Sequence, residues 1–393
     1  MRHHTRRRRA HRDLHRSRPT TRKVVIAGVI VCALIGAAIY WRYGHRSEQS
    51  RLIESLALFA NLPENTWVRV AVGNDGNWTR QGHAGLAYDS KRGSLLIFGS
   101  DTHGANWDNT VHEFSPLLRE WHTLGAIAGP ETYAATSTGL PAAGANGRQP
   151  WAMHTYDGIE YDPKLDALIV AAATDHNPAP VSGITGQRTW IFERATAQWR
   201  PLDGDPESKV RLFGAALAYD GWRDTLVLCR EGIWELGPKR TAWQQVARAE
   251  RCDLHHNLVF DSDSGHFIVF GRYRASADLW EYSPGLTAGM KGEWKQLGAV
   301  DCPLMSGLPV AYDRNAHKFV LVAKLNRAGS KDEYGTFTYD PRAGRCTQIT
   351  GANIDPGHMN FMMVWHANLR VSLLVTGDWR QPTEVWALRL AKR

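Results

Sequence analysis

Histidine recurs in this chain at fixed distances before an aromatic–aspartate pair. His83 and His255 lie five residues before the aromatic residue of such a pair, His154 and His358 lie seven residues before it, and His256 adjoins His255. Imidazole titrates near neutral pH and is a common ligand of zinc, copper and iron, so converging histidines could act as acid–base groups or hold a metal. The competing interpretation is structural, because polar side chains at such positions often hydrogen-bond to neighbouring backbone.

Carboxylates recur after the same aromatic residue. Asp101, Asp175 and Asp378 follow it by 13 or 14 residues, and Arg272 lies in the corresponding loop of another repeat. If these segments meet, an acidic, histidine-rich half of a site would face a basic half. The candidate catalytic residues are His154, His358, Asp101, Asp175 and Arg272, and the first four are also candidate ligands of a divalent metal. Independent turn roles for the aspartates remain the alternative, since Asp commonly hydrogen-bonds to its own turn.

No standard catalytic signature accompanies these residues. The sequence contains no nucleophile elbow, P-loop, HExxH zinc motif or glycine-rich dinucleotide turn. Any chemistry therefore depends on the elements that bring the histidines and carboxylates together.

A four-strand pattern repeats six times along the chain. Each unit has an apolar strand ending in aromatic–Asp, a polar turn, a strongly apolar strand, an aromatic strand and a strand that opens with Trp. The first strands are expected at 82–89, 156–162, 214–220, 256–261, 308–313 and 360–366. The sixth unit lacks its fourth strand, which residues 65–70 match, so pairing of the two ends would close a ring. We expect an all-β fold, a six-bladed β-propeller over residues 65–393.

The repeat resembles the kelch family of propellers. The units average about 54 residues, near the roughly 50 of kelch repeats, and carry the aromatic–Asp and Trp landmarks at matching offsets. One departure is the double glycine usual after the second strand, which is reduced to a single glycine at Gly99, Gly271 and Gly377. The resemblance implies a central channel with binding loops around one mouth. Kelch-like propellers include periplasmic sugar epimerases and copper oxidases of galactose.

Two loops are long enough to suggest function. Residues 125–152 and 174–187 exceed the usual limit of about 12–15 residues for a simple connection, and both belong to the expected binding face. Exposed aromatic residues there, such as Trp107, Trp151 and Trp379, could stack on sugar rings. The candidate ligand-binding residues are His83, His103, Trp107, His176, His255, His256, Asp378, Trp379 and Arg380.

The positive charge of the chain is concentrated at its start. Residues 1–23 hold ten of the 47 Lys and Arg residues and one of the 39 acidic residues, which leaves 37 basic and 38 acidic residues elsewhere. A nearly neutral body gives no support for nucleic-acid binding. The tail precedes eighteen uncharged residues, from Val24 to Trp41, which are just long enough to cross a bilayer.

We expect a single-pass membrane protein with an uncleaved anchor at 24–41. The basic tail would hold the N-terminus in the cytoplasm, and the propeller would lie outside, in the periplasm if the source is Gram-negative. A stalk at 42–64 would contain a short helix with Leu52, Ile53, Leu56 and Phe59 on one face. In an oxidising compartment Cys229, Cys252, Cys302 and Cys346 could form disulfides, with three connectivities open.

These expectations combine into two functional hypotheses. The first is an anchored propeller that binds a glycan or a partner protein through the loops around its channel. The alternative is a periplasmic carbohydrate-active enzyme, of an epimerase, mutarotase or metal-dependent type, with a His/Asp site at the channel mouth.

Overall fold

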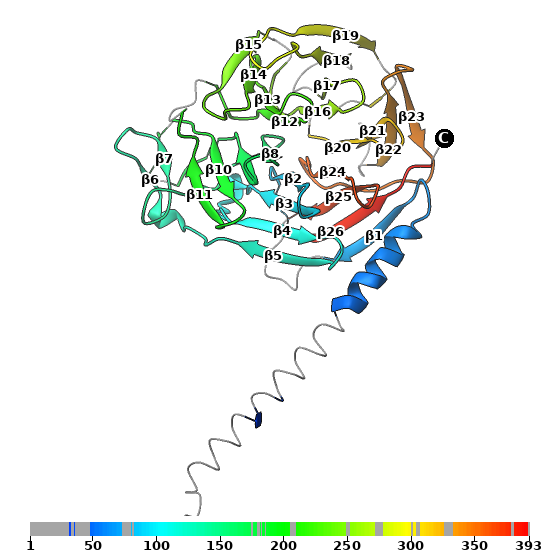
Figure 1. Ribbon diagram of the computed structural model, residues 1–393, viewed down its shortest axis with the longest axis horizontal. Coiled ribbons are helices and arrows are strands. Elements are labelled where there is room, and N and C mark those ends of the chain that lie inside the picture. The colour runs from blue at the N-terminus through cyan, green and yellow to red at the C-terminus, as the bar shows by residue number, and fades with distance from the viewer. Residues whose placement is uncertain are drawn as a thin grey trace, which may run out of the picture. The chain divides into compact units, whose positions relative to one another are not determined.

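The computed structural model divides into two compact units, residues 1–54 and 55–393. The residues that it describes are 31–32, 35, 48–72, 80, 82–173, 176–178, 181, 183–184, 186–204, 210–248, 252–271, 278–299, 302–303, 307–325, 333–378 and 381–391. The second unit contains every described strand and is a six-bladed β-propeller (Figure 1).

Five blades are formed by consecutive strands, each paired antiparallel to the next. Blade one comprises β2 (Gly85–Asp89), β3 (Ser94–Phe98), β4 (Val111–Ser115) and β5 (Glu120–Leu124). Blade two comprises β8 (Ile159–Asp162), β9 (Ala167–Val170), β10 (Trp190–Glu193) and β11 (Gln198–Pro201). Blade three comprises β12 (Ala216–Asp220), β13 (Thr225–Cys229), β14 (Ile233–Leu236) and β15 (Gln244–Ala247). Blade four comprises β16 (Asn257–Asp261), β17 (His266–Phe270), β18 (Asp278–Ser283) and β19 (Glu293–Ala299). Blade five comprises β20 (Val310–Asp313), β21 (Lys318–Lys324), β22 (Tyr334–Asp340) and β23 (Arg345–Ile349).

The sixth blade draws on both ends of the propeller. It comprises β24 (Met363–His366), β25 (Val371–Asp378), β26 (Gln381–Leu388) and, as its outermost strand, β1 (Trp67–Val72), which pairs antiparallel with β26. The indole of Trp67 donates a hydrogen bond of 2.7 Å to the Thr336 hydroxyl of blade five. Trp243 of blade three makes the same contact, 2.8 Å long, to Thr189 of blade two. In these two blades the Trp landmark fastens the fourth strand to the preceding blade.

The Asp of the aromatic–Asp landmark holds the turn after each first strand. Asp220, which is buried, accepts backbone N–H bonds of 2.8 Å from Trp222 and 3.1 Å from Arg223. Equivalent bonds are made by Asp89, Asp162, Asp261 and Asp313. Blade six carries His366 instead, whose Nδ1 accepts from Leu369 N–H at 3.2 Å. Side-chain capping of this kind satisfies turn N–H groups that the strands leave unpaired.

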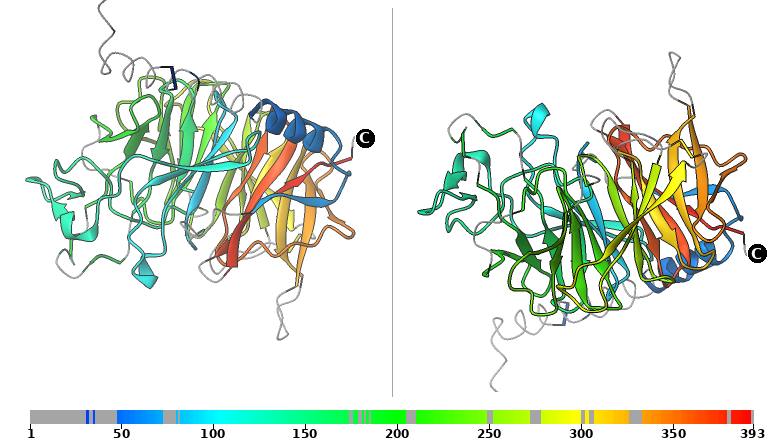
Figure 2. Two further views of the ribbon diagram at one scale, coloured as in Figure 1. Left: turned by 90° about the horizontal axis from the view of Figure 1, so that it is seen from below. Right: turned by 90° about the horizontal axis from the view of Figure 1, so that it is seen from above.

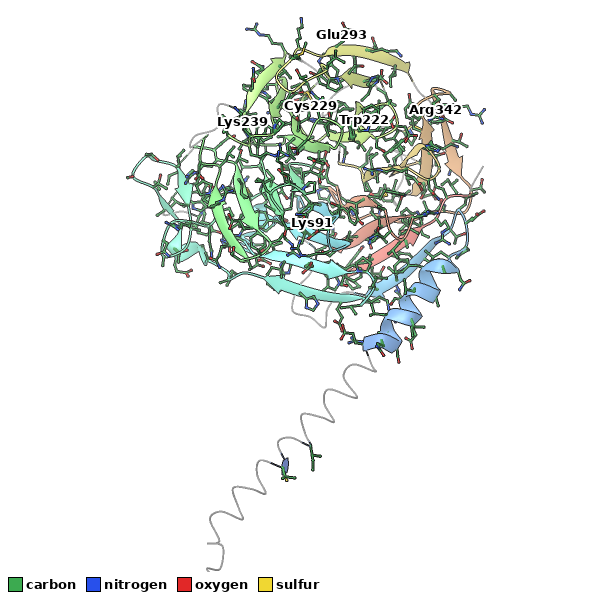
Figure 3. All side chains as sticks on the ribbon, viewed as in Figure 1. Lys91, Trp222, Cys229, Lys239, Glu293 and Arg342 are labelled. Atoms are coloured by element: carbon green, nitrogen blue, oxygen red, sulfur yellow. A yellow bond between two sulfur atoms is a disulfide. The ribbon has the colours of Figure 1, made fainter. Side chains whose placement is uncertain are left out.

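The strands run between the two faces of the ring (Figure 2). The hydrophobic clusters lie between adjacent blades. Glu293 and Arg342, from outer parts of the blades, lie at the rim, whereas Trp222 lies nearer the centre (Figure 3). Two disulfides join Cys229 to Cys252 and Cys302 to Cys346, which selects one of the three connectivities.

The predicted short helix is present over residues 48–60. Within the second unit, Phe59 and Leu62 are buried in the cluster shared by blades one and six, and the Arg389 guanidinium bonds to the carbonyls of Phe59 and Ala60. The predicted apolar face is only partly correct, because Ile53 and Leu56 are 67% and 51% exposed.

The expected anchor at 24–41 lies almost wholly outside the described residues, and so does the basic tail at 1–23. Among the residues that are described, no helix is both long enough and apolar enough to span a membrane.

Candidate functional site

Three histidines from three separate segments meet at one mouth of the central channel. His83 precedes β2, His103 lies between β3 and β4, and His154 precedes β8. One ring nitrogen from each lies within 4.8 Å of the other two. The rings of His83 and His154 are stacked with centroids 4.4 Å apart, and His103 lies 4.6 Å from His154. We call His83, His103 and His154 the histidine cluster.

His154 is the buried member of the cluster. Its Nε2 lies 2.9 Å from the Thr102 hydroxyl and its Nδ1 lies 3.0 Å from the Tyr156 hydroxyl. A backbone bridge to Ala173 fixes its position beside the end of β9. With two hydroxyl partners, which can each donate or accept, the ring is held in place in either tautomer.

His103 is positioned by a single turn of 3₁₀ helix, η1 (Thr102–Gly104). The Asp101 carboxylate caps this turn by accepting N–H bonds from His103 at 3.2 Å and Gly104 at 3.4 Å. The same carboxylate lies 3.6 Å from His83 Nδ1. The turn role and the proximity to histidine, which the sequence left as alternatives for Asp101, therefore occur together.

His83 is held in its neutral form. Burial lowers its pKa to about 4, and the nearby His103, His358 and His255 oppose a further positive charge, against the attraction of Asp101. Its Nδ1 is buried and makes no hydrogen bond to any of the described residues. Because buried polar atoms are normally hydrogen-bonded, Nδ1 of His83 is a candidate ligand atom.

Three further histidines border the cluster. His176 Nε2, in the β9–β10 loop, lies 3.2 Å from His103 Nδ1. The ring of His358, before β24, is centred 5.9 Å from that of His83. His255, before β16, is centred 4.7 Å from the ring of Tyr156. The predicted gathering of first-strand entries and second-to-third-strand loops is therefore seen in the geometry.

Tyr156 occupies the centre of this mouth. Its ring contacts His83 of blade one, Phe213 before blade three, His255 before blade four and Phe361 before blade six, at centroid distances of 4.7–5.9 Å. The sequence placed residues 156–158 in a strand, whereas β8 starts only at Ile159. The reason is that these residues leave the blade and cross the channel.

Hydrogen bonds to several blades hold the crossing segment. The N–H groups of Thr155 and Tyr156 donate to the His83 carbonyl at 3.0 and 2.8 Å, and Leu217 N–H of blade three donates to the Asp157 carbonyl at 2.8 Å. Tyr156 has a φ of 47°, a left-handed conformation that few non-glycine residues adopt. Gly85 makes room for it, because a Cβ there would lie 2.2 Å from the Tyr156 carbonyl oxygen.

A fully buried arginine supports the loops beside the cluster. The guanidinium of Arg80 donates to the carbonyls of Gly377, His358 and Met359 at 2.6, 3.1 and 3.3 Å. Burial lowers its pKa to about 10, and Asp378 acts in the opposite direction. Arg80 thereby links the β1–β2 connection to the loops of blade six. Asp378, at the end of β25, belongs to this support and is not placed in the cluster.

Several predicted residues have other positions. His256 is buried next to Arg230 and Asp253, and its pKa is lowered to about 4 by burial, as in a core histidine. Trp151 was expected to be exposed, which is wrong. It is 2% exposed, stacks on Tyr133 at 5.2 Å and donates to the Ala142 carbonyl. Asp175, Arg272, Trp379 and Arg380 lie outside the described residues.

The two long loops build a small hydrophobic cluster of their own. Residues of 125–152 form the η2 turn (Pro130–Thr132) and the strand pair β6 (Ala134–Ala135) and β7 (Pro141–Ala142), which lie outside blade two at the edge of the ring (Figure 1). Tyr133 and Trp151 pack there with Val181 from the second loop, and half-buried Trp107 covers them. The loops support the wall beside the site.

The donors of the histidine cluster fit a transition-metal ion. Nitrogens around a tetrahedral zinc, at about 2.1 Å each, would be about 3.4 Å apart. The histidine nitrogens, which are now up to 4.8 Å apart, would have to come closer together by about 1.4 Å. His83 offers its unpartnered Nδ1, and His154 would exchange the Thr102 or Tyr156 hydroxyl for the metal.

Sequence reasoning missed Tyr156, Thr102 and Arg80. Only Tyr156 carried a usable signal, since blade two has an aromatic–Asp pair at both 156–157 and 161–162. No known protein-family model matches the chain, and no similar protein is found among curated proteins.

Proposed function

We propose that this chain is a membrane-anchored, extracytoplasmic propeller that binds a divalent transition metal at its channel mouth and uses it to act on an oxygen-rich ligand such as a glycan. The observation that carries the proposal is the convergence of His83, His103 and His154 to within 4.8 Å. Catalytic zinc sites commonly use three protein ligands, whereas structural zinc sites use four, and the cluster offers three histidine nitrogens.

Each surrounding residue has a defined task in this proposal. A bound ion would supply Lewis acidity toward a hydroxyl or carbonyl oxygen of the ligand. His83 is available without loss of a proton, because its pKa of about 4 lies well below neutral pH. His176 orients the ring of His103 through the contact of 3.2 Å between their nitrogens. His358 is an exposed side chain beside the histidine cluster and would exchange protons with a ligand.

Metal binding is favoured over a purely aromatic glycan platform. A stacking platform needs exposed flat rings, yet Trp151 is buried and Trp107 is half-buried against Tyr133. The glycan therefore stays in the proposal as the ligand, recognised through its oxygens. We also propose that the repeats are of the kelch type, on the strength of the aromatic–Asp and Trp landmarks.

The cellular location in this proposal rests on two independent features. The uncharged run at 24–41 follows ten basic residues, as in an anchor with a cytoplasmic N-terminus. Both disulfides lie in the propeller, and disulfides persist in oxidising compartments.

Metal content tests the proposal directly. The tail contributes four histidines of its own, His3, His4, His11 and His15, so these are first replaced by Ala in the full-length chain, which is purified in detergent without a histidine tag. Cobalt(II) titration, followed by visible absorption, and elemental analysis then count bound metal. We expect one equivalent, with affinity at least tenfold weaker in His83→Ala and in His103→Ala.

His122→Ala is the matched control, because His122 is an exposed histidine on the outer strand β5. The proposal is wrong if the background protein binds no metal, or if His122→Ala loses as much affinity as the cluster variants. His103 is exposed, so its replacement is expected to leave folding intact.

A further inference from the structure

The opposite end of the channel contains a separate cavity of about 380 Å³. Its wall is formed by the first strands of all six blades, and its rim by the turns that follow them. One aromatic residue from each blade lines it: Tyr88, Tyr161, Tyr219, Phe260, Tyr312 and Trp365. These residues end the first strands, whereas the histidine cluster precedes them, so a strand of about 16 Å separates the aromatic end of the cavity from the cluster.

Two carboxylates from blade two line the cavity, Asp157 and Glu160. At the position of Glu160 the other five blades have apolar residues: Ala87, Ala218, Val259, Ala311 and Val364. Asp157 belongs to the segment that crosses the channel, and with Phe361 it lies at the inner end of the cavity. The other five blades form the same strand without a charge at this position. The fold therefore does not require the Glu160 carboxylate.

The hydrogen-bond partners of these carboxylates are N–H groups and an amide. Asp157 accepts from Leu258 N–H at 2.8 Å and from the Asn257 amide at 3.5 Å, and Glu160 accepts from Tyr161 N–H at 2.8 Å. Among the ion pairs formed by the described residues, neither carboxylate has a cationic partner. Arg314, also in the lining, is exposed and lies with its guanidinium 5.6 Å from the Trp365 ring centroid.

Burial disfavours the ionised form of both carboxylates. It raises the pKa of Asp157 well above its usual range and that of Glu160 to about 7. The charge of Glu160 raises the pKa of Asp157 further, whereas Asp162 raises and Arg314 lowers the pKa of Glu160. A ligand that brought a positive charge into the cavity would relieve this unfavourable burial.

We propose that this cavity binds a small organic ammonium ion, with its cationic head at Asp157 and Glu160 and its apolar part among the six aromatic residues. The volume of 380 Å³ falls within the roughly 300–1,000 Å³ of small-molecule sites. Carboxylates in a lining that is otherwise largely apolar favour alkylammonium groups, which combine charge with apolar surface.

Other ligand classes fit less well. An inorganic cation would leave the aromatic lining without a function, and it would need more oxygen ligands than the two carboxylates supply. A neutral sugar would leave both carboxylates without a counter-charge. This site does not depend on the histidine cluster, and its test uses no metal.

Calorimetric titration at pH 8 tests the inference on the full-length protein. The probe is choline, and its control is 3,3-dimethyl-1-butanol, which has the same shape without the charge. We expect choline to bind at least tenfold more tightly than the alcohol. Glu160→Gln should weaken choline binding at least tenfold and leave the alcohol unchanged, whereas Glu160→Asp, which keeps the charge, should retain binding within about threefold.

A matched surface control separates local from general charge effects. Glu293→Gln removes an exposed carboxylate at the rim of the propeller and should leave choline affinity unchanged. Thermal unfolding checks that each variant is folded. Equal binding of choline and the alcohol, no binding of choline, or equal effects of Glu160→Gln and Glu293→Gln would each overturn the inference.

Discussion

Tyr156 and its neighbours show how single residues turn a repetitive scaffold into one with a site. The positive φ of Tyr156 is an unfavourable backbone conformation of order 1 kcal/mol or more, and such conformations persist where surrounding contacts enforce them. Those contacts come from blades one, three, four and six. The same segment supplies His154 to one end of the channel and Asp157 to the other. One irregular stretch of blade two therefore serves both proposed sites.

Glu160 should make the stability of the protein depend on pH. Its pKa is about 7 in the folded protein against 4.5 in the unfolded chain, mainly because of burial. Between these values the folded state holds a proton that the unfolded state releases. The stability that protonated Glu160 contributes is therefore complete below about pH 4.5 and is lost as pH rises through 7.

The contribution of Glu160 to the free energy of unfolding can be measured by urea unfolding at pH 5 and pH 8. The pKa difference sets a ceiling of about 3.4 kcal/mol, and access of water to the cavity reduces it to about 1–2 kcal/mol. As pH rises from 5 to 8, the free energy of unfolding of Glu160→Gln should increase by this amount relative to that of the wild type. Asp157 keeps part of the pH dependence in the variant. An identical pH dependence in both proteins would contradict the prediction.

At the scale of elements, buried arginines connect neighbouring blades through the turns. Arg240 of blade three donates through Nε to Asp162 of blade two, and through Nη2 to Asp224 at 2.6 Å. Arg194 of blade two bonds in the same way to Asp89 of blade one, at 3.0 Å. The Asp that caps a turn thus also forms an ion pair with an arginine of the adjacent blade. These ion pairs fix the position of one sheet relative to the next.

Arg240→Met should destabilise the propeller by about 3–5 kcal/mol, because it leaves Asp162 buried without its cationic partner. Arg211→Met is the control, since the Arg211–Glu231 pair is 63% and 53% exposed and should contribute less than about 1 kcal/mol. Denaturant midpoints of the two variants provide the comparison. Adding Asp162→Asn to Arg240→Met should recover part of the loss. Equal effects of the two single variants would refute the role of Arg240.

The strands could be predicted from sequence because each carries a local signature. Alternating apolar residues, a turn-capping Asp and a leading Trp depend on the backbone of one blade, and all recur five or six times. The error at 156–158 arose from the same rule. Tyr156–Asp157 matches the aromatic–Asp landmark locally, but its contacts come from distant blades. Long-range contacts of this kind leave no periodic signal.

At the scale of the whole molecule, ring symmetry explains which site residues could be foreseen. Equivalent positions in different blades point to one mouth, so His83, His154, His255 and His358 could be expected to converge. Their distances could not, because they depend on how far the crossing segment extends into the channel. Arg80 lies between the Trp67 landmark and the first aromatic–Asp pair, and it reaches the loops of blade six only once the ring has formed.

Both disulfides lie in the part of the ring formed by blades three to five. Cys346 stands at the second position of β23, where the other blades have Trp, and its bond to Cys302 replaces the Trp contact with a covalent one. Cys252, before blade four, is bonded to the end of β13 in blade three. Each disulfide therefore ties a segment that connects two blades to a strand of one of those blades.

Removing either bond should cost about 3–4 kcal/mol, since the bridged residues are 23 and 44 apart and a closed loop of that size restricts the unfolded chain. The test compares Cys229→Ala/Cys252→Ala and Cys302→Ala/Cys346→Ala with the wild type, each with and without reductant. Reductant should lower the unfolding midpoint of the wild type more than that of either double variant, because one bond remains in each. A wild-type midpoint that reductant does not change, while free thiols appear, would show that the ring is held by its blade contacts alone.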